Sequence, residues 1–176
     1  DRPSPFAYRL VRSTTRDESM ADPPTVLVVE DEESFIEALV VGLKREGFLV
    51  KVARDGAEGL EMFDQVRPDL ILLDVWLPRV SGIDVCRELR SRSRVPIIPA
   101  AIAGTFESWP RSRPVPILHP LRVHFGRPIL PDEIATKETA AVTRLIRDRL
   151  LECQRIARGG LAGDLPVLLA LAQRRV

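Results

Sequence analysis

The stretch from Asp69 to Gly82, DLILLDVWLPRVSG, constrains the fold more than any other part of the sequence. An apolar run of strand length, Leu70 to Leu73, ends in the carboxylate of Asp74, and Leu77-Pro78 and Ser81-Gly82 then turn the chain. A carboxylate at the carboxyl end of a buried strand lies where open α/β sheets bind their ligands. Asp74 is therefore the first candidate functional residue.

A second strand of the same kind lies upstream, in TVLVVEDEES. The apolar run from Val26 to Val29 leads directly into Glu30 and Asp31. In a parallel sheet these acids lie beside Asp74, and carboxylates that close together repel one another unless they share a proton or bind a cation. Mg²⁺ is the cation that fits best, because it prefers oxygen ligands and works beside phosphate. Capping of the next helix is the simpler interpretation for an isolated acidic pair, but the spacing to Asp74 favours a metal site.

Residues 24–98 resemble the first two-thirds of a bacterial response-regulator receiver domain. The resemblance depends on the VLVVEDEE start, on Asp74 at the end of the third strand, on Pro78 and on Gly82. It implies that Asp74 accepts a phosphoryl group from the phosphohistidine of a sensor histidine kinase. It also implies that Glu30, Asp31 and Asp74 hold Mg²⁺, together with the main-chain carbonyl of Trp76.

Strands and helices alternate from Thr25 to Ile98 at the spacing of βαβ units, which predicts an α/β fold with a doubly wound parallel sheet. This is the receiver, or flavodoxin-like, architecture. The apolar periodicity predicts strands at 25–29, 48–52, 70–74 and 95–98 and helices at 33–46 and 83–92. A further helix between the second and third strands has Ala57, Leu60 and Phe63 on its apolar face.

The receiver pattern fails beyond Ile98. The family ends its fourth strand with a small hydroxyl residue, where this chain has Ala101, and it follows the fifth strand with Lys-Pro, where this chain has Arg127-Pro128. Arginine does not replace lysine in reach or geometry. Prolines between 96 and 131 also disfavour the family's fourth helix, so an atypical proline-rich segment is expected in its place.

Residues 95–157 resemble the carboxyl-terminal part of 1-acyl-glycerol-3-phosphate acyltransferases. The resemblance depends on VPIIP at 95–99, on Gly104-Thr105 and on GRPI at 126–129. The family's catalytic His-x4-Asp motif is absent, because the residue five positions after His119 is His124. The family's general base therefore cannot be carried over to His119 or His124. We expect His124 to lie on the solvent side of a strand at 121–125 and Trp109 to be a packing residue.

The sequence suggests four segments: a disordered leader at 1–23, a receiver-like part at 24–98, an acyltransferase-like part at 99–158 that completes the sheet, and a tail at 159–176. A long helix is expected from Pro131 to about Ala157, and a short apolar helix in the tail after Asp164 and Pro166. Cys86 and Cys153 have no metal-ligand spacing and indicate a reduced compartment.

The composition fits a cytoplasmic protein: the hydrophobic content is 45%, the net charge is +1, and no apolar run is long enough to span a bilayer. The leading expectation is a Mg²⁺-dependent phosphoacceptor domain with a sensor histidine kinase as partner and with impaired switching. A homodimer is compatible with the sequence, and nothing indicates a nucleic-acid interface. The alternatives are a fragment of a glycerolipid acyltransferase and an interaction module that is not phosphorylated.

Overall fold

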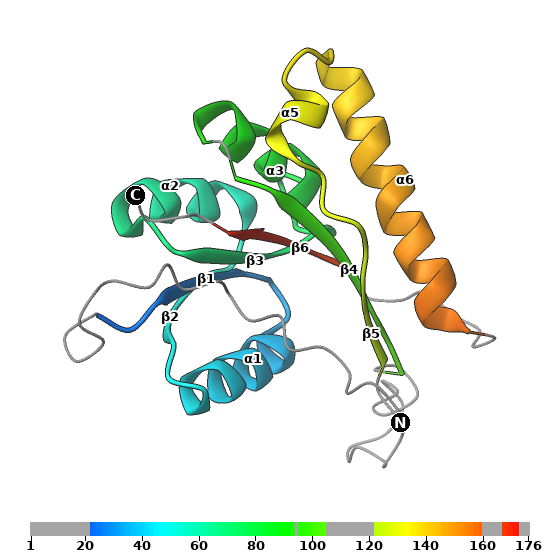
Figure 1. The fold of residues 1–176 in the computed structure, drawn as a ribbon. Coiled ribbons are helices and arrows are strands. Elements are labelled where there is room, and N and C mark those ends of the chain that lie inside the picture. The colour runs from blue at the N-terminus through cyan, green and yellow to red at the C-terminus, as the bar shows by residue number, and fades with distance from the viewer. Residues whose placement is uncertain (1–21, 94, 105–121, 160–166, 173–176) are drawn as a thin grey trace, which may run out of the picture.

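The computed structural model describes residues 22–93, 95–104, 122–159 and 167–172. Residues 1–21 of the predicted leader, Trp109, His119 and most of the proline-rich segment lie outside these residues. Figure 1 shows one sheet with helices on both faces, which confirms the predicted fold class. None of the described helices is long and apolar enough to cross a membrane.

The first part of the chain forms three parallel strands joined by two helices. β1 (Thr25–Val29) lies between β2 (Leu49–Ala53) and β3 (Leu70–Asp74), and α1 (Glu33–Arg45) and α2 (Gly56–Val66) make the crossovers. α3 (Gly82–Arg92) follows β3 and leads to β4 (Ile97–Ala103). The bounds of β1, α1, β2, β3 and α3 agree with the sequence prediction to within one residue, whereas β4, predicted at 95–98, begins two residues later and ends five residues later.

The second part of the chain forms a hairpin-like edge and a long helix. β5 (Arg122–Phe125) is antiparallel to β4, and α6 (Thr139–Arg158) packs beside α3 on the face that also carries α2 (Figure 1). The prediction of a parallel strand at 121–125 is therefore wrong. A parallel pair needs a crossover of a dozen or more residues that is usually helical, and the prolines between 105 and 121 disfavour such a helix.

The predicted helix from Pro131 to Ala157 is interrupted. α5 (Pro131–Ile134) is a single turn that buries Ile134 in the core, and α6 begins anew after Glu138, whose backbone is extended. The chain turns between the two helices because the turn lets Ile134 and the apolar stripe of α6 both face the sheet.

The tail contains β6 (Val167–Ala172), which is a strand and not the predicted helix. It is antiparallel to β3 on one side and to β4 on the other, so the strand order is β2-β1-β3-β6-β4-β5. Leu169 is fully buried. The run VLLALA is apolar at every position, which is typical of a central strand covered on both faces, and six residues are too few for a stable helix.

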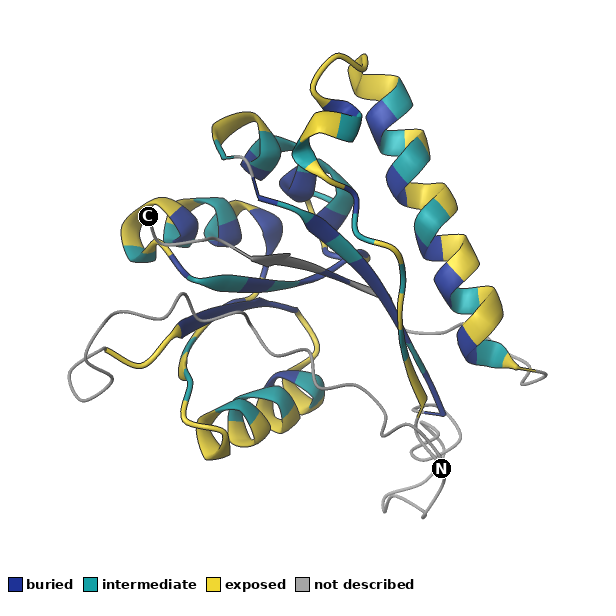
Figure 2. Cartoon of the chain, in the orientation of Figure 1, coloured by how far each residue is buried: buried dark blue, intermediate teal, exposed yellow. Residues whose placement is uncertain are grey.

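The described helices cover the two faces of the sheet unequally. The main core lies between the sheet and α2, α3 and α6, and it includes Ile97, Ala101 and Ala103 of β4. The alternate residues of β4 face the other side, where α1 is the one described helix (Figures 1 and 2). Val123 and Phe125 lie opposite Ile102 and Ala100 and are 53% and 58% exposed.

The prediction that His124 faces the solvent is therefore wrong. His124 lies opposite Ala101, on the α6 face, and is partly buried, whereas Val123 and Phe125 face the solvent. The apolar side chains of β5 point toward the less covered face because the antiparallel pairing sets which residues share a face with the core residues of β4.

Candidate phosphoacceptor site

The predicted acids converge at the carboxyl ends of β1 and β3. Glu30 and Asp31 directly follow β1, and Asp74 is the last residue of β3, its parallel neighbour. One carboxylate oxygen from each of the three residues lies within 4.8 Å of the other two. Mg²⁺ binds oxygen ligands at about 2.1 Å, so the three side chains can reach a single small cation once their oxygens move closer together.

Main-chain hydrogen bonds hold two of the carboxylates in place. Asp74 accepts hydrogen bonds from the backbone N–H groups of Val75 (2.7 Å) and Trp76 (3.2 Å). Glu30 accepts one from the N–H of Glu32 (3.1 Å), and its own N–H donates to the carbonyl of Ala53 (3.0 Å). Trp76 thus lies beside the Asp74 carboxylate, and its carbonyl as a ligand stays a prediction.

Burial and the charges of neighbouring acids raise the pKa values of Glu30 and Asp74. Glu30 is 5% exposed and Asp74 9%. Burial, and then the charge of Asp74, raise the pKa of Glu30 to about 7. Burial also raises the pKa of Asp74 to about 6, against the lowering effect of the Val75 and Trp76 N–H groups and with a smaller increase from Asp31 and Glu32. A cation between the three acids would reverse this penalty, because it favours the ionised forms.

Gly82 is required where the chain returns past the site. A Cβ atom at this position would lie 1.9 Å from the carbonyl oxygen of Asp74. The N–H of Gly82 also donates to the carbonyl of Val75 at 3.1 Å. α3 therefore begins in direct contact with the backbone of the candidate phosphoacceptor.

In a flavodoxin-like sheet, with strand order 2-1-3-4-5, the fourth strand lies directly beside the third. Here another strand lies between β3 and β4. This strand is β6, since its Leu168 lies opposite both Asp74 and Ala100. At about 4.8 Å per strand, β4 is displaced to roughly 10 Å from β3. Ala101, which stands where the family has a hydroxyl residue, is buried on a strand that lies between β6 and β5.

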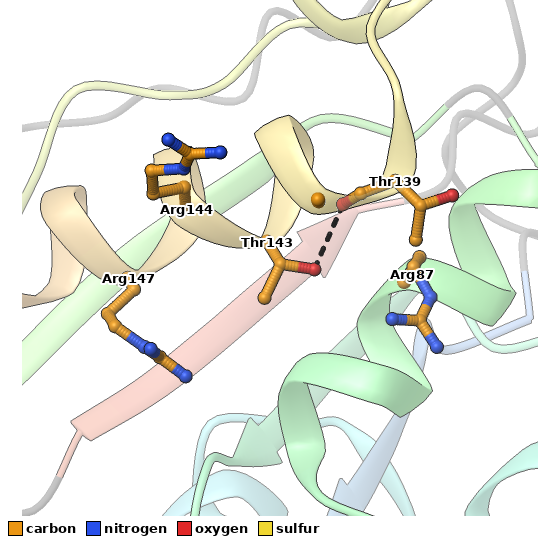
Figure 3. Close-up of a pocket in the computed structure, with 6 residues that line it drawn as sticks. Arg87, Thr139, Thr143, Arg144 and Arg147 are labelled. Atoms are coloured by element: carbon orange, nitrogen blue, oxygen red, sulfur yellow. Dashed lines mark hydrogen bonds between the residues drawn. The ribbon is translucent and has the colours of Figure 1, made fainter.

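A separate surface pocket of about 510 Å³ lies between α3 and the first turns of α6. Arg87, Arg144 and Arg147 line it with Thr139, Ala140 and Thr143. In Figure 3, the side chains of Arg144 and Arg147 extend away from one another, and Arg87 is already paired with Asp84 at 3.0 Å. The three guanidinium groups therefore do not converge on one point, and the pocket is no part of the acidic site.

Comparison with known proteins identifies the segment that carries this site. Residues 26–107 match the response regulator receiver domain. The receiver match covers Glu30, Asp31 and Asp74 but ends before β5 and α6. It gives no support to the acyltransferase resemblance of residues 95–157.

Named relatives match the same receiver segment. The chain is 50% identical over 74 residues to the "Sensory transduction protein RegX3" of Mycobacterium tuberculosis, a match that covers 42% of this chain and 33% of the relative. It is 48% identical over 79 residues to the "Transcriptional regulatory protein CseB" of Streptomyces coelicolor, covering 45% of this chain and 34% of that protein. The chain thus spans about a third of the length of these relatives.

Solved receiver structures also match, over about two-fifths of the chain. The Francisella response regulator 1452 receiver domain is 29% identical, with a TM-score of 0.38 over 39% of this chain and 57% of the other. Vibrio cholerae chemotaxis protein CheY4 is 30% identical, with a TM-score of 0.39 over 40% and 58%. The fold assignment itself depends on the strand order and connections described above.

Proposed function

We propose that Asp74 is the phosphoacceptor of a two-component phosphorelay and that a sensor histidine kinase supplies the phosphoryl group. The observation that carries this proposal is the convergence of the Glu30, Asp31 and Asp74 carboxylates within a receiver segment. The match covers about a third of each relative, so the activity is proposed here for the matched segment alone. A cytoplasmic location follows from such a partner.

The transfer itself needs few groups from the protein. A carboxylate oxygen of Asp74 forms a bond to phosphorus, the bond between phosphorus and the histidine nitrogen breaks, and its electron pair stays on the imidazole. Glu30 and Asp31 would hold Mg²⁺ with Asp74, and the bound ion would neutralise charge on the phosphoryl group. The N–H groups of Val75 and Trp76 orient the nucleophile by holding its oxygens.

Switching after phosphorylation is proposed to be impaired. The residue in the family's hydroxyl position is Ala101, which has no side-chain hydroxyl, and its strand is separated from β3 by β6. Arg127, in place of the family's lysine, is exposed beyond the far edge strand β5. Neither residue supports a contact with a phosphoryl group on Asp74.

Two measurements test the proposal. In a Trp109→Phe background, Trp76 is the one tryptophan left, and its fluorescence should respond to Mg²⁺ in a saturable way. Asp74→Asn should weaken this response, whereas Glu37→Gln, an exposed acid on α1, should not. Incubation with acetyl phosphate and Mg²⁺ should then add the mass of one phosphoryl group to the parent chain and none to Asp74→Asn.

The outcomes separate the alternatives. A chain that shows neither a Mg²⁺ response nor a mass increase would contradict the proposal and leave a protein-interaction module. A mass increase that persists in Asp74→Asn would place the phosphoacceptor elsewhere.

A further inference from the structure

The loop that follows Asp74 contacts this residue at both of its ends. Its first residues, Val75 and Trp76, hold the Asp74 carboxylate through their N–H groups. At its other end, Gly82 lies against the carbonyl of Asp74. The N–H groups at the start of this loop, residues 75–81, therefore hold the Asp74 oxygens.

An ion pair connects the middle of this loop to α2. Arg79 donates from Nη2 to the Oδ2 atom of Asp55, the residue that precedes α2. The other oxygen of Asp55 accepts from the N–H groups of Ala57 (2.9 Å) and Glu58 (3.0 Å), so the same carboxylate caps the helix and binds the loop. The Asp55 side chain is 13% exposed and that of Arg79 68%.

Two further observations indicate that this contact fixes the loop. Arg79 has a φ of +65°, a left-handed conformation that residues other than glycine rarely adopt and that persists only where the surroundings enforce it. A Cβ atom on Gly56 would also lie 2.6 Å from the carbonyl oxygen of Val80. The backbone of the loop is thus packed directly on the first residue of α2.

We propose that Arg79 is a positioning residue, whose ion pair with Asp55 keeps the N–H groups of Val75 and Trp76 on the carboxylate of Asp74. The inference rests on the proposed role of Asp74 as the phosphoacceptor. It assigns the start of α2 an indirect part in that chemistry, because Asp55 touches neither Asp74 nor the other acids of the site through any described hydrogen bond.

Amide hydrogen exchange in the metal-free protein tests the contact without any phosphorylation. Arg79→Gln and Asp55→Asn should each speed exchange at Val75 and Trp76 by about two- to fivefold, the range expected when a partly exposed ion pair is lost. The double variant should be no faster than either single variant. Arg79→Lys, which keeps the positive charge, should exchange more slowly than Arg79→Gln.

A matched control comes from another ion pair on α2. Arg92 of α3 pairs with Asp64 of α2 at 2.7 Å, and Arg92→Gln should leave the Val75 and Trp76 amides unchanged. The amides of Ala57 and Glu58, read in the same spectra, report whether Asp55→Asn has disturbed the helix cap. Unchanged exchange at Val75 and Trp76 in Arg79→Gln would overturn the inference.

Phosphorylation by acetyl phosphate gives the second measurement. The maximal rate should fall in Arg79→Gln, by at most about fivefold for the loss of an exposed ion pair, with the half-saturating acetyl phosphate concentration unchanged, since the substitution misplaces the nucleophile and does not remove a binding group. A rise in the half-saturating concentration alone would contradict a positioning role. If the parent chain is not phosphorylated, the proposed function fails, and the exchange experiment still decides whether Arg79 holds the loop.

Discussion

Two glycines differ sharply in what surrounds them, and this difference predicts opposite effects of alanine. Gly82→Ala should destabilise the protein by more than about 2 kcal/mol and weaken Mg²⁺ binding, because the added methyl group would collide with the Asp74 carbonyl at 1.9 Å. A methyl group on Gly42, within α1, would meet no atom within 4 Å, so Gly42→Ala should stabilise by about 0.5–1 kcal/mol. Urea unfolding measures both, and equal effects would contradict the described approach of α3 to Asp74.

The pKa of Glu30, raised to about 7, makes the stability of the metal-free protein depend on pH. Between the ordinary carboxyl range and about pH 7 the folded chain holds a proton on Glu30 that the unfolded chain has lost. The free energy of unfolding therefore falls as the pH rises through this window. Glu30→Gln should gain stability relative to the parent as the pH rises from about 5 to 7.5, which unfolding curves at the two values measure. A constant difference between the two proteins would contradict the raised pKa.

The affinity for Mg²⁺ should increase with pH, whereas the stability of the metal-free protein decreases. Because the ion needs ionised carboxylates, its affinity should rise over the pH range in which Glu30 and Asp74 lose their protons. Fluorescence titrations of Trp76 at several pH values measure this, and a pH-independent affinity would show that these acids are not the ligands.

The candidate acids were predictable from sequence because each follows an apolar run of strand length. Strand ends in a parallel sheet meet at one edge, so Glu30, Asp31 and Asp74 could be placed together without coordinates. The pair of Asp55 and Arg79 could not be found in this way. Asp55 is recognisable as a helix cap, but nothing in the pattern indicates that a loop arginine reaches it from 24 positions away.

Among the elements, β6 shows most clearly where pattern reading fails. Its apolar residues fit a buried strand as well as a short helix, and only the position between β3 and β4 decides between them. The strands from β1 to β4 were predictable since their apolar runs are separated by helices of regular period. The same local signals exist in the tail, but no periodicity shows which strands it joins.

Leu169 allows the place of β6 to be tested. It is fully buried in the main core, whereas Leu151 on α6 is 55% exposed. Leu169→Ala should lower the free energy of unfolding by about 2–5 kcal/mol, and Leu151→Ala by less than about 0.5 kcal/mol. Chemical denaturation measures both. Similar small losses for the two leucines would show that β6 does not lie inside the sheet.

For the whole molecule, the unequal cover of the sheet has a consequence for association. Val123 and Phe125 are exposed on β5, one of the two edge strands of the described sheet, and edge strands with exposed apolar residues tend to pair with other chains. Val123→Lys should reduce concentration-dependent association in sedimentation velocity. Val41→Lys, on the exposed side of α1 at 60% exposure, is the matched control and should have little effect. Association that is equally reduced by both would point to general charge and not to β5.

The insertion of β6 also affects the order in which the protein can fold. Leu70 pairs with Ala172, although the two residues are far apart in the sequence. Contacts this distant in sequence form slowly, because a long loop must close first. During synthesis, the strand that carries Asp74 has an open edge until the last described strand has left the ribosome. A nascent chain that is held before that point should therefore be vulnerable to proteases and to pairing with its neighbours, even though every residue of the acidic site has already been made.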